Sequence, residues 1–222
     1  MEIVITCEHA SNRVPAALRH RMHRQYSSSI LESHVAYDLF SALAARRLAR
    51  NLGAPLLEGR WSRLCIDLNR SLSNPSVWSR IASQMTKAER ESWIKYHMEY
   101  RARAEAAIRK ASIRSQVLHI SVHSFTPVLK GQSRNCDIGW LYDPSRKGEV
   151  QYARWFQRQL RESGWKVRRN YPYRGIADGH TTHLRNLFVE DKYIGLELEL
   201  NQSLEKDVLK VVDHLSRKLK YR

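Results

Sequence analysis

The sequence contains no apolar stretch near the roughly 20 residues that a membrane-spanning helix needs. Its N-terminus has neither a basic start nor an apolar signal segment, and residues 3–7 read directly as a strand. We therefore expect a cytoplasmic protein with no membrane partner. Hydrophobic residues make up 42% of the 222 residues, a share that argues against disorder and suits one domain over residues 1–222.

Cysteine is scarce and shows no paired spacing. Cys7, Cys65 and Cys136 are far apart, odd in number, and form no Cys-x-x-Cys motif. Cys7 and Cys65 lie in apolar runs, so we interpret them as small buried residues. A cysteine hydrolase that uses Cys7 with His9 is an alternative, although a reactive thiolate needs an exposed, electropositive setting.

Acidic residues are also few, with 22 Asp and Glu against 38 Lys and Arg, which gives a formal charge of +16. Nucleic acid, an acidic surface or an anionic substrate would each suit such a charge. The basic residues are spread along the chain, without a basic tail, zinc-finger spacing or an RNA-binding sheet signature. We therefore expect a solvated basic surface, and a non-catalytic or nucleic-acid-binding protein with the same fold is the alternative function.

Strand and helix patterns alternate along the chain, as is typical of an α/β fold. We expect strands at residues 2–7, 54–57, 62–68, 116–122, 137–142, 165–169 and 193–200. Helices are expected at residues 30–51, 87–111, 149–163 and 204–219. Capping-box spacing marks the first two helix starts, with Ser29 and Glu32 and then Thr86 and Glu89. Residues 170–183 are expected to form a functional loop.

Polar residues follow several of these strands: His9, the Asp67–Arg70 segment, and His123. In open α/β sheets, ligands bind beyond the carboxyl ends of the strands. Two histidines and a carboxylate would make a hydrolytic zinc site, and an Asn-Arg pair would offer a fork for a substrate carboxylate. Each feature also has a structural reading, because a lone histidine is often a satisfied polar residue and Asp67 and Arg70 would suit an ion pair.

The last strand carries Glu197 and Glu199, which point to the same face because side chains alternate along a strand. Two carboxylates flanked by Ile194, Leu196 and Leu198 are costly to bury without a cation or a metal. This pair therefore favours a functional site more strongly than the other features do.

Several motifs resemble the N-formylglutamate amidohydrolase family. They run in family order over nearly the whole chain and include Cys-Glu-His-Ala-Ser-Asn at 7–12, Ser-Arg-Leu at 62–64, Asp-Leu-Asn-Arg at 67–70, His-Ser-Phe-Thr-Pro at 123–127, Pro-Tyr-Arg-Gly at 172–175 and Glu-Leu-Glu-Leu-Asn-Gln at 197–202. The resemblance implies a phosphorylase/hydrolase-like three-layer sandwich with a central mixed sheet, similar to the zinc-dependent exopeptidases. It also implies cleavage of a linear amide C–N bond in a small anionic N-formyl or N-acyl amino acid, such as N-formylglutamate.

The resemblance further implies roles for individual residues. His9 and His123 would bind Zn²⁺ or another divalent metal, and Glu199 would be the general base, with Glu197 beside it. Substrate binding is implied for Asn69, Arg70, Arg174, Thr182 and Arg185.

The third metal ligand is where this chain departs from the pattern. The exopeptidases usually carry Glu three residues after the first histidine, but Asn12 stands there, and an amide is a poor zinc ligand. We expect Asp38 instead, because residues 34–38 also resemble a family motif. A structural charge on a helix is the alternative for Asp38. Glu8 ranks lower as a ligand, since it would point to the opposite face from His9.

Overall fold

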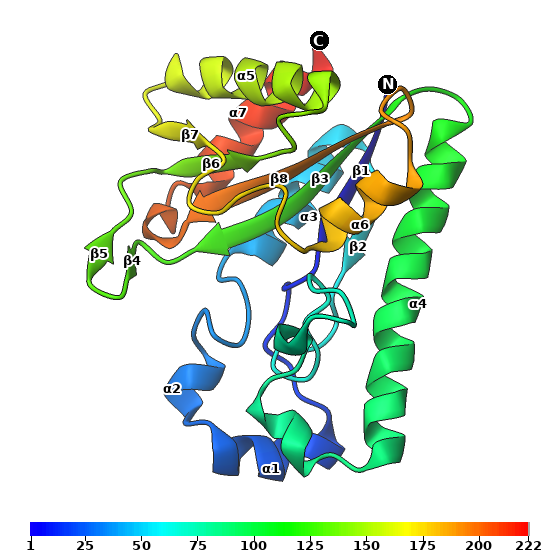
Figure 1. Cartoon of the computed structure of the whole chain (residues 1–222). Coiled ribbons are helices and arrows are strands. Elements are labelled where there is room, and N and C mark those ends of the chain that lie inside the picture. The colour runs from blue at the N-terminus through cyan, green and yellow to red at the C-terminus, as the bar shows by residue number, and fades with distance from the viewer. Residues whose placement is uncertain (222) are drawn as a thin grey trace.

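A mixed six-stranded sheet forms the centre of the protein, in a computed structural model that describes residues 1–221 (Figure 1). The strand order is β2-β1-β3-β8-β6-β7, with bounds β1 Glu2–Cys7, β2 Leu56–Glu58, β3 Val117–Phe125, β6 Ile138–Leu141, β7 Val167–Arg169 and β8 Tyr193–Asn201. The first four strands in this order are parallel, whereas β6 runs antiparallel to β8. Strands β4 (Val128–Leu129) and β5 (Gln132–Ser133) form a separate hairpin.

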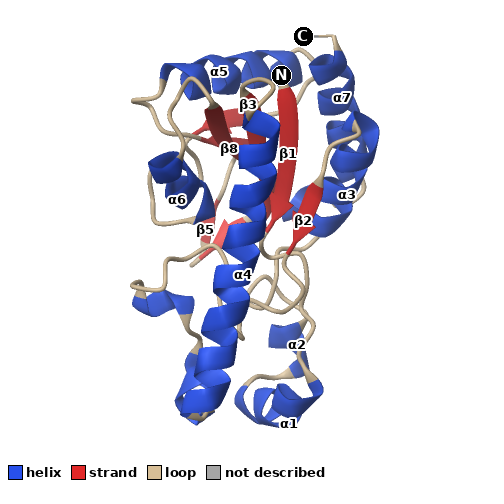
Figure 2. Cartoon of the chain, turned by 90° about the vertical axis from the view of Figure 1, so that its right-hand side faces the viewer, coloured by secondary structure: helices blue, strands red, loops and turns tan. Residues whose placement is uncertain are grey.

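Helices cover both faces of the sheet, so the three-layer α/β architecture predicted from the sequence is confirmed (Figure 2). One face packs against α3 (Ser41–Leu52), α5 (Lys147–Arg161) and α7 (Val208–Lys220). The other packs against α4 (Lys87–Ser112) and α6 (His180–Leu187). Among residues 1–221, no helix combines the length and apolar composition that crossing a bilayer requires.

A smaller hydrophobic cluster lies beyond one end of the sheet, where α1 and α2 sit below it in Figure 1. It joins α1 (Ala16–Gln25) and α2 (Ser28–Leu31) to the 3-10 helices η1 (Pro75–Val77) and η2 (Arg80–Gln84). Helix α4 is 26 residues long and spans both regions, so its Trp93 joins this cluster while Tyr100 and Ala104 pack under the sheet. The predicted capping box holds its start, since Thr86 Oγ1 accepts from Glu89 N (3.2 Å) and the Glu89 carboxylate accepts from Thr86 N (2.8 Å).

The alternation of side chains on β3 and β8 explains why one sheet face is apolar and the other carries polar groups. Leu118, Ile120 and Val122 point into the core beside α3, α5 and α7. The residues between them place polar side chains on the α4 and α6 face. The register pairs Ser121 with Glu197 and His123 with Glu199, so imidazole and carboxylate groups become neighbours. Both strands extend slightly further than predicted, which puts His123 within β3 rather than after it.

The predicted helix over residues 30–51 is wrong in its first half. Helix α2 ends at Leu31, turns follow, and α3 begins only at Ser41, after Phe40 with φ 64°. Ser27, not Ser29, caps α2. The backbone of the intervening turns bonds outward, since Asp38 N donates to His9 O (3.0 Å). Helical periodicity continues through this segment, but tertiary hydrogen bonds break the helix and place Asp38 beside the end of β1.

The predicted strand over residues 62–68 is also wrong. This segment forms turns and packs Leu64, Cys65 and Ile66 into the cluster around α1 and η2. Its backbone bonds to other loops, as when Asp67 N donates to Val77 O (2.9 Å), and not to the sheet. Two smaller differences concern helix starts: α6 begins at His180, inside the expected loop, and α7 begins at Val208, after the 3-10 helix η3 (Gln202–Leu204).

Candidate active site

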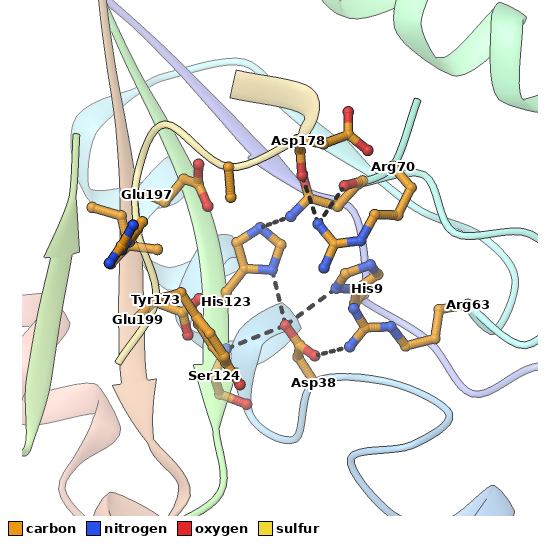
Figure 3. Close-up of a pocket in the computed structure, with 14 residues that line it drawn as sticks. His9, Asp38, Arg63, Arg70, His123, Ser124, Tyr173, Asp178, Glu197 and Glu199 are labelled. Atoms are coloured by element: carbon orange, nitrogen blue, oxygen red, sulfur yellow. Dashed lines mark hydrogen bonds and ion pairs between the residues drawn. The ribbon is translucent and has the colours of Figure 1, made fainter. Parts of the chain in front are cut away.

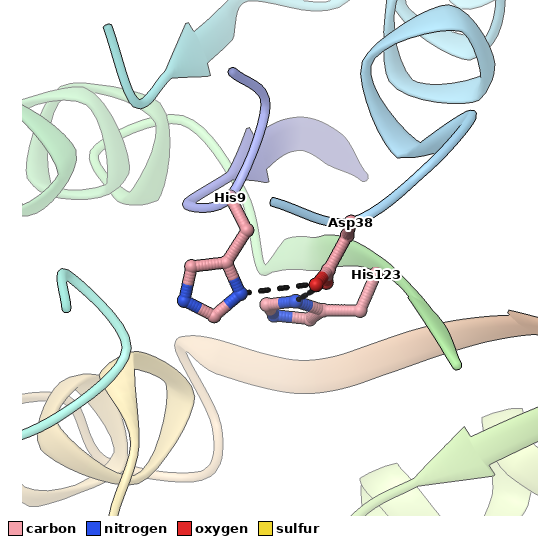
Figure 4. A group of neighbouring side chains, drawn as sticks. All are labelled: His9, Asp38 and His123. Atoms are coloured by element: carbon pink, nitrogen blue, oxygen red, sulfur yellow. Dashed lines mark hydrogen bonds and ion pairs between the residues drawn. The ribbon is translucent and has the colours of Figure 1, made fainter. Parts of the chain in front are cut away.

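His9, Asp38 and His123 meet in a buried group at the carboxyl ends of β1 and β3 (Figure 4). One ligand atom from each lies within 4.8 Å of the others. Asp38 Oδ2 is 2.9 Å from His123 Nδ1 and 3.4 Å from His9 Nδ1, so both rings turn the same nitrogen toward one carboxylate oxygen. The structure thus brings together the three residues that the sequence predicted as ligands.

The second nitrogen of each ring also faces a carboxylate. His9 Nε2 is 2.7 Å from Asp67 Oδ1, and His123 Nε2 is 3.2 Å from Glu8 Oε2. Metal-binding histidines commonly hold their free ring nitrogen in this way, which fixes the ring orientation. The alternative interpretation, a structural ion pair of Asp67 with Arg70, does not occur within residues 1–221, because Asp67 contacts His9 and Arg63 Nη2 (3.2 Å) instead.

The charges around the group suit a bound cation. Burial would raise the pKa of Asp38, but His9 and Arg63 hold it well below its usual range. Burial would lower the pKa of His123, yet hydrogen bonds to Asp38 and Glu8 raise it well above its usual range. The carboxylates of Asp38 and Glu8 therefore favour a positive charge at the position of His123. Two imidazoles and one carboxylate are also the donor set of catalytic zinc sites, so these residues fit a divalent metal.

Glu197 and Glu199 reach the same region from β8 (Figure 3). Burial raises the pKa of Glu199 to about 8, with His123 opposing the shift and the charges of Asp38 and Glu197 adding to it. Burial likewise raises the pKa of Glu197. Within residues 1–221, Glu199 Oε2 has no hydrogen-bond partner. A buried carboxylate with an unpartnered oxygen and a pKa near neutrality is typical of a group that exchanges protons.

A cavity of about 200 Å³ opens in front of these groups. Figure 3 shows the two glutamates on one side of His123, with Arg63 and Arg70 on the other. Arg70 Nη1 donates to Asp178 O (2.6 Å), which anchors the guanidinium at the wall. The cavity is lined by His9, Asp38, Arg63, Asn69, Arg70, His123, Ser124, Leu141, Tyr173, Arg174, Ala177, Asp178, Glu197 and Glu199.

Two predicted substrate-binding residues are not among those lining the cavity. The Thr182 hydroxyl donates to Ala177 O (2.7 Å), and Arg185 Nε donates to the buried Glu149 carboxylate (2.9 Å). Both residues lie on α6, which begins at His180. Their side chains there bind the preceding loop and α5. The structure does not bring them to the cavity, whereas Asn69, Arg70 and Arg174 do line it.

Other residues of the site were not singled out from the sequence. Arg63 bridges Asp38 and Asp67, with Nη1 3.1 Å from Asp38 Oδ1. Tyr173 and Asp178 come from the loop after β7. Arg63 and Tyr173 lie within two of the family-like motifs, so the sequence did mark these segments. The spacing of the motifs does not show that these two side chains reach the cavity.

The alternative of a Cys7 nucleophile finds no support in this geometry. The Cys7 thiol is fully buried, and burial raises its pKa well above its usual value. Its Sγ donates to Ser41 Oγ (3.3 Å) on the α3 face of the sheet, away from His9. A thiol in such a setting is not reactive.

Comparisons with known proteins agree with this description. The family model for N-formylglutamate amidohydrolase matches residues 1–204. A crystal structure of a gene product from Agrobacterium tumefaciens superposes with a TM-score of 0.82 and 27% identity, covering 97% of this chain and 88% of that one. A crystal structure of N-formylglutamate amidohydrolase from Ralstonia eutropha gives a TM-score of 0.68 and 19% identity, covering 99% and 94%. The search of curated proteins found no match.

Proposed function

The chain belongs to the N-formylglutamate amidohydrolase family, and on that premise we propose that it is a metal-dependent hydrolase of a small N-formyl or N-acyl amino acid, such as N-formylglutamate. The observation that carries this proposal is the buried group of His9, Asp38 and His123 beside a cavity that also contains Glu199. The reaction adds water across the amide, so that the C–N bond breaks and the acid and the free amine are released.

Zn²⁺ is the proposed metal, because two imidazoles and a carboxylate are its usual catalytic ligands. When bound, it would polarise the amide carbonyl and make water more acidic. His9, Asp38 and His123 would hold it, and Arg63 would keep Asp38 oriented through its 3.1 Å contact.

Glu199 is the proposed general base. Its carboxylate would take a proton from the attacking water and deliver it to the leaving amine nitrogen. In the metal-free protein the pKa of this carboxyl is about 8, and the charge of a bound metal would lower it toward the range in which the group both accepts and releases a proton. Glu197 lies two residues away on the same face, and its negative charge helps to raise the pKa of Glu199.

Asn69 and Arg70 are proposed to hold a carboxylate of the substrate. A guanidinium presents a planar fork that matches a carboxylate, and Arg70 is already anchored at the cavity wall by Asp178. Arg174 adds a second guanidinium to the lining. A cavity of about 200 Å³ with this charge suits a small anionic substrate.

The experiment is metal analysis of the purified protein combined with release of formate or amine from a panel of N-formyl and N-acyl amino acids. Glu199→Gln should keep its Zn²⁺ and lose a factor on the order of 10² to 10⁴ in kcat, because the amide keeps the shape and removes the base. Glu197→Gln is the matched control on the same strand and should lose less. If both variants kept full turnover, the strand carboxylates would be structural and this mechanism would fail.

The alternative of nucleic-acid binding gains no specific support. Stacking on bases requires exposed aromatic faces beside basic residues. Trp93 and Trp140 are buried, the other four tryptophans are half-buried, and the exposed Tyr173, with Arg134 against its ring, is part of the cavity lining.

A further inference from the structure

We propose that Glu8 is a positioning residue. Its carboxylate binds Nε2 of His123 and so keeps the opposite nitrogen, Nδ1, directed at the proposed metal site between His9, Asp38 and His123. This inference rests on the proposed function, since it concerns a proposed ligand of the metal. Glu8 follows β1 directly and is fully buried. It is not among the residues that line the cavity, so it would act through His123 and not on a bound substrate. Its carboxylate instead contacts His123 Nε2 at 3.2 Å.

The surroundings of Glu8 explain how a carboxylate is tolerated at this depth. Oε2 accepts a hydrogen bond from the Ser121 hydroxyl (2.6 Å), and Oε1 accepts one from the Tyr100 hydroxyl (3.0 Å). The ring of His180 lies further off, with Nε2 4.0 Å from Oε1. A buried carboxylate is costly unless donors surround it. Here β3 and α4 supply those donors, and the histidine completes the set.

The partners of His123 Nε2 show that this nitrogen carries a proton. Ser121 Oγ is 2.9 Å from Nε2, and since its hydroxyl donates to Glu8, its oxygen remains an acceptor. Nε2 therefore faces two acceptors, the Glu8 carboxylate and the Ser121 oxygen. The Asn69 amide nitrogen is a donor facing the same atom, but at 3.4 Å it is the longest of these contacts. Two nearer acceptors outweigh one distant donor, so Nε2 carries a proton.

Nδ1, the other ring nitrogen, is then the one that would bind a metal. A neutral imidazole carries one N–H, and a nitrogen that binds a metal must carry none. Nδ1 faces Asp38 Oδ2, 2.9 Å away, so a metal held between these two atoms would take the place of the proton on Nδ1, while Nε2 would keep its proton toward Glu8. Asp67 faces His9 Nε2 in the same sense at 2.7 Å, and His9 also turns Nδ1 toward Asp38. Both rings thus direct Nδ1 toward Asp38, and in each ring Nε2 contacts a second carboxylate.

The test is titration of the full chain with Zn²⁺ alone, read by calorimetry or by competition with a chelator. Glu8→Gln keeps the shape of the side chain but replaces one carboxylate oxygen with an NH₂ group. That NH₂ would face Ser121, Tyr100 or His123, which all donate to Glu8 in the parent, so the hydrogen bond to the His123 ring is weakened. Loss of such a partner typically weakens metal affinity about 10- to 100-fold, and we expect that increase in Kd. Glu149→Gln is the matched control, because Glu149 is also a fully buried carboxylate but pairs with Arg185. Its Kd for Zn²⁺ should stay at the parent value.

Histidine ¹⁵N NMR of the Zn²⁺-loaded parent gives a readout that needs no variant and no turnover. We expect the rings that respond to Zn²⁺ to carry a proton on Nε2 and none on Nδ1. Ligation of His123 through Nε2, or an unchanged Kd in Glu8→Gln, would overturn the role of Glu8 while leaving the metal hydrolase intact. A parent that bound no Zn²⁺ would overturn the proposed function, and this inference with it.

Discussion

Replacing Glu199 with glutamine should change how the stability of the metal-free protein depends on pH. The Glu199 side chain is buried at the cavity wall, and that burial raises its pKa from 4.5 to about 8. The charges of Asp38 and Glu197 add to this shift, while His123 opposes it. The folded protein therefore keeps this carboxyl protonated at pH values where the unfolded chain has already released the proton.

The size of the effect follows from the difference between the two pKa values. The contribution of this carboxyl to stability is complete below its unfolded pKa of 4.5 and is lost as pH rises through the folded value of about 8. Glutamine has the same shape and no proton to lose. The free energy of unfolding of Glu199→Gln, relative to the parent, should therefore increase by about 2 kcal/mol between about pH 6 and about pH 8.

Urea unfolding of both proteins at the two pH values, with a chelator present, measures this difference. Groups that titrate alike in the two proteins cancel in the comparison, so the change isolates the substituted carboxyl. Parallel stability profiles would refute the reasoning, because they would mean that Glu199 is already ionised in the folded protein near neutral pH. If the variant lost more stability than the parent between these two pH values, the predicted sign of the effect would be refuted as well.

Three further predictions concern recognition, metal binding and folding. Arg70→Lys should raise KM for acidic N-formyl amino acids roughly tenfold or more, because a point charge replaces the planar fork, and should leave KM for neutral ones nearly unchanged. Asp38→Asn should weaken Zn²⁺ binding by more than the roughly 100-fold that loss of an outer partner can cost, since an amide is a poor ligand; equilibrium dialysis would show it. Thr86→Ala should lower the free energy of unfolding by about 1 kcal/mol in urea, because it removes the cap of α4, and a midpoint equal to that of the parent would contradict this.

The central sheet was predictable because its strands are apolar runs whose ends carry polar residues. The predicted bounds of β1 agree with the structure, and β3 and β8 differ by only a few residues. This accuracy located His9, His123 and Glu199 at one edge of the sheet before any contact was known. The roles of these residues in metal binding and catalysis remain predictions.

The surroundings of the site were harder to foresee, because tertiary contacts override local pattern there. Asp38 was expected within a helix, but its backbone bonds to the loop after β1 and its side chain thereby reaches both histidines. Residues 62–68 have the composition of a strand, yet they pack as a buried loop that delivers Arg63 and Asp67. The contact of Glu8 with His123 joins residues 115 positions apart, and a periodic pattern carries no signal for such a pair.

Some residues of this site lie on strands of the central sheet and others lie on loops, and the two groups differ in how readily they tolerate substitution. His123 and both glutamates lie on β3 and β8, adjacent nine-residue strands that are buried along their full length. Arg70, Tyr173 and Arg174 lie on loops between helices and strands. Loops accept substitution far more readily than a central ladder does. We therefore expect that exchanging residues 170–179 would change which small molecules the cavity accepts, while His123 and the two glutamates keep their positions on the sheet.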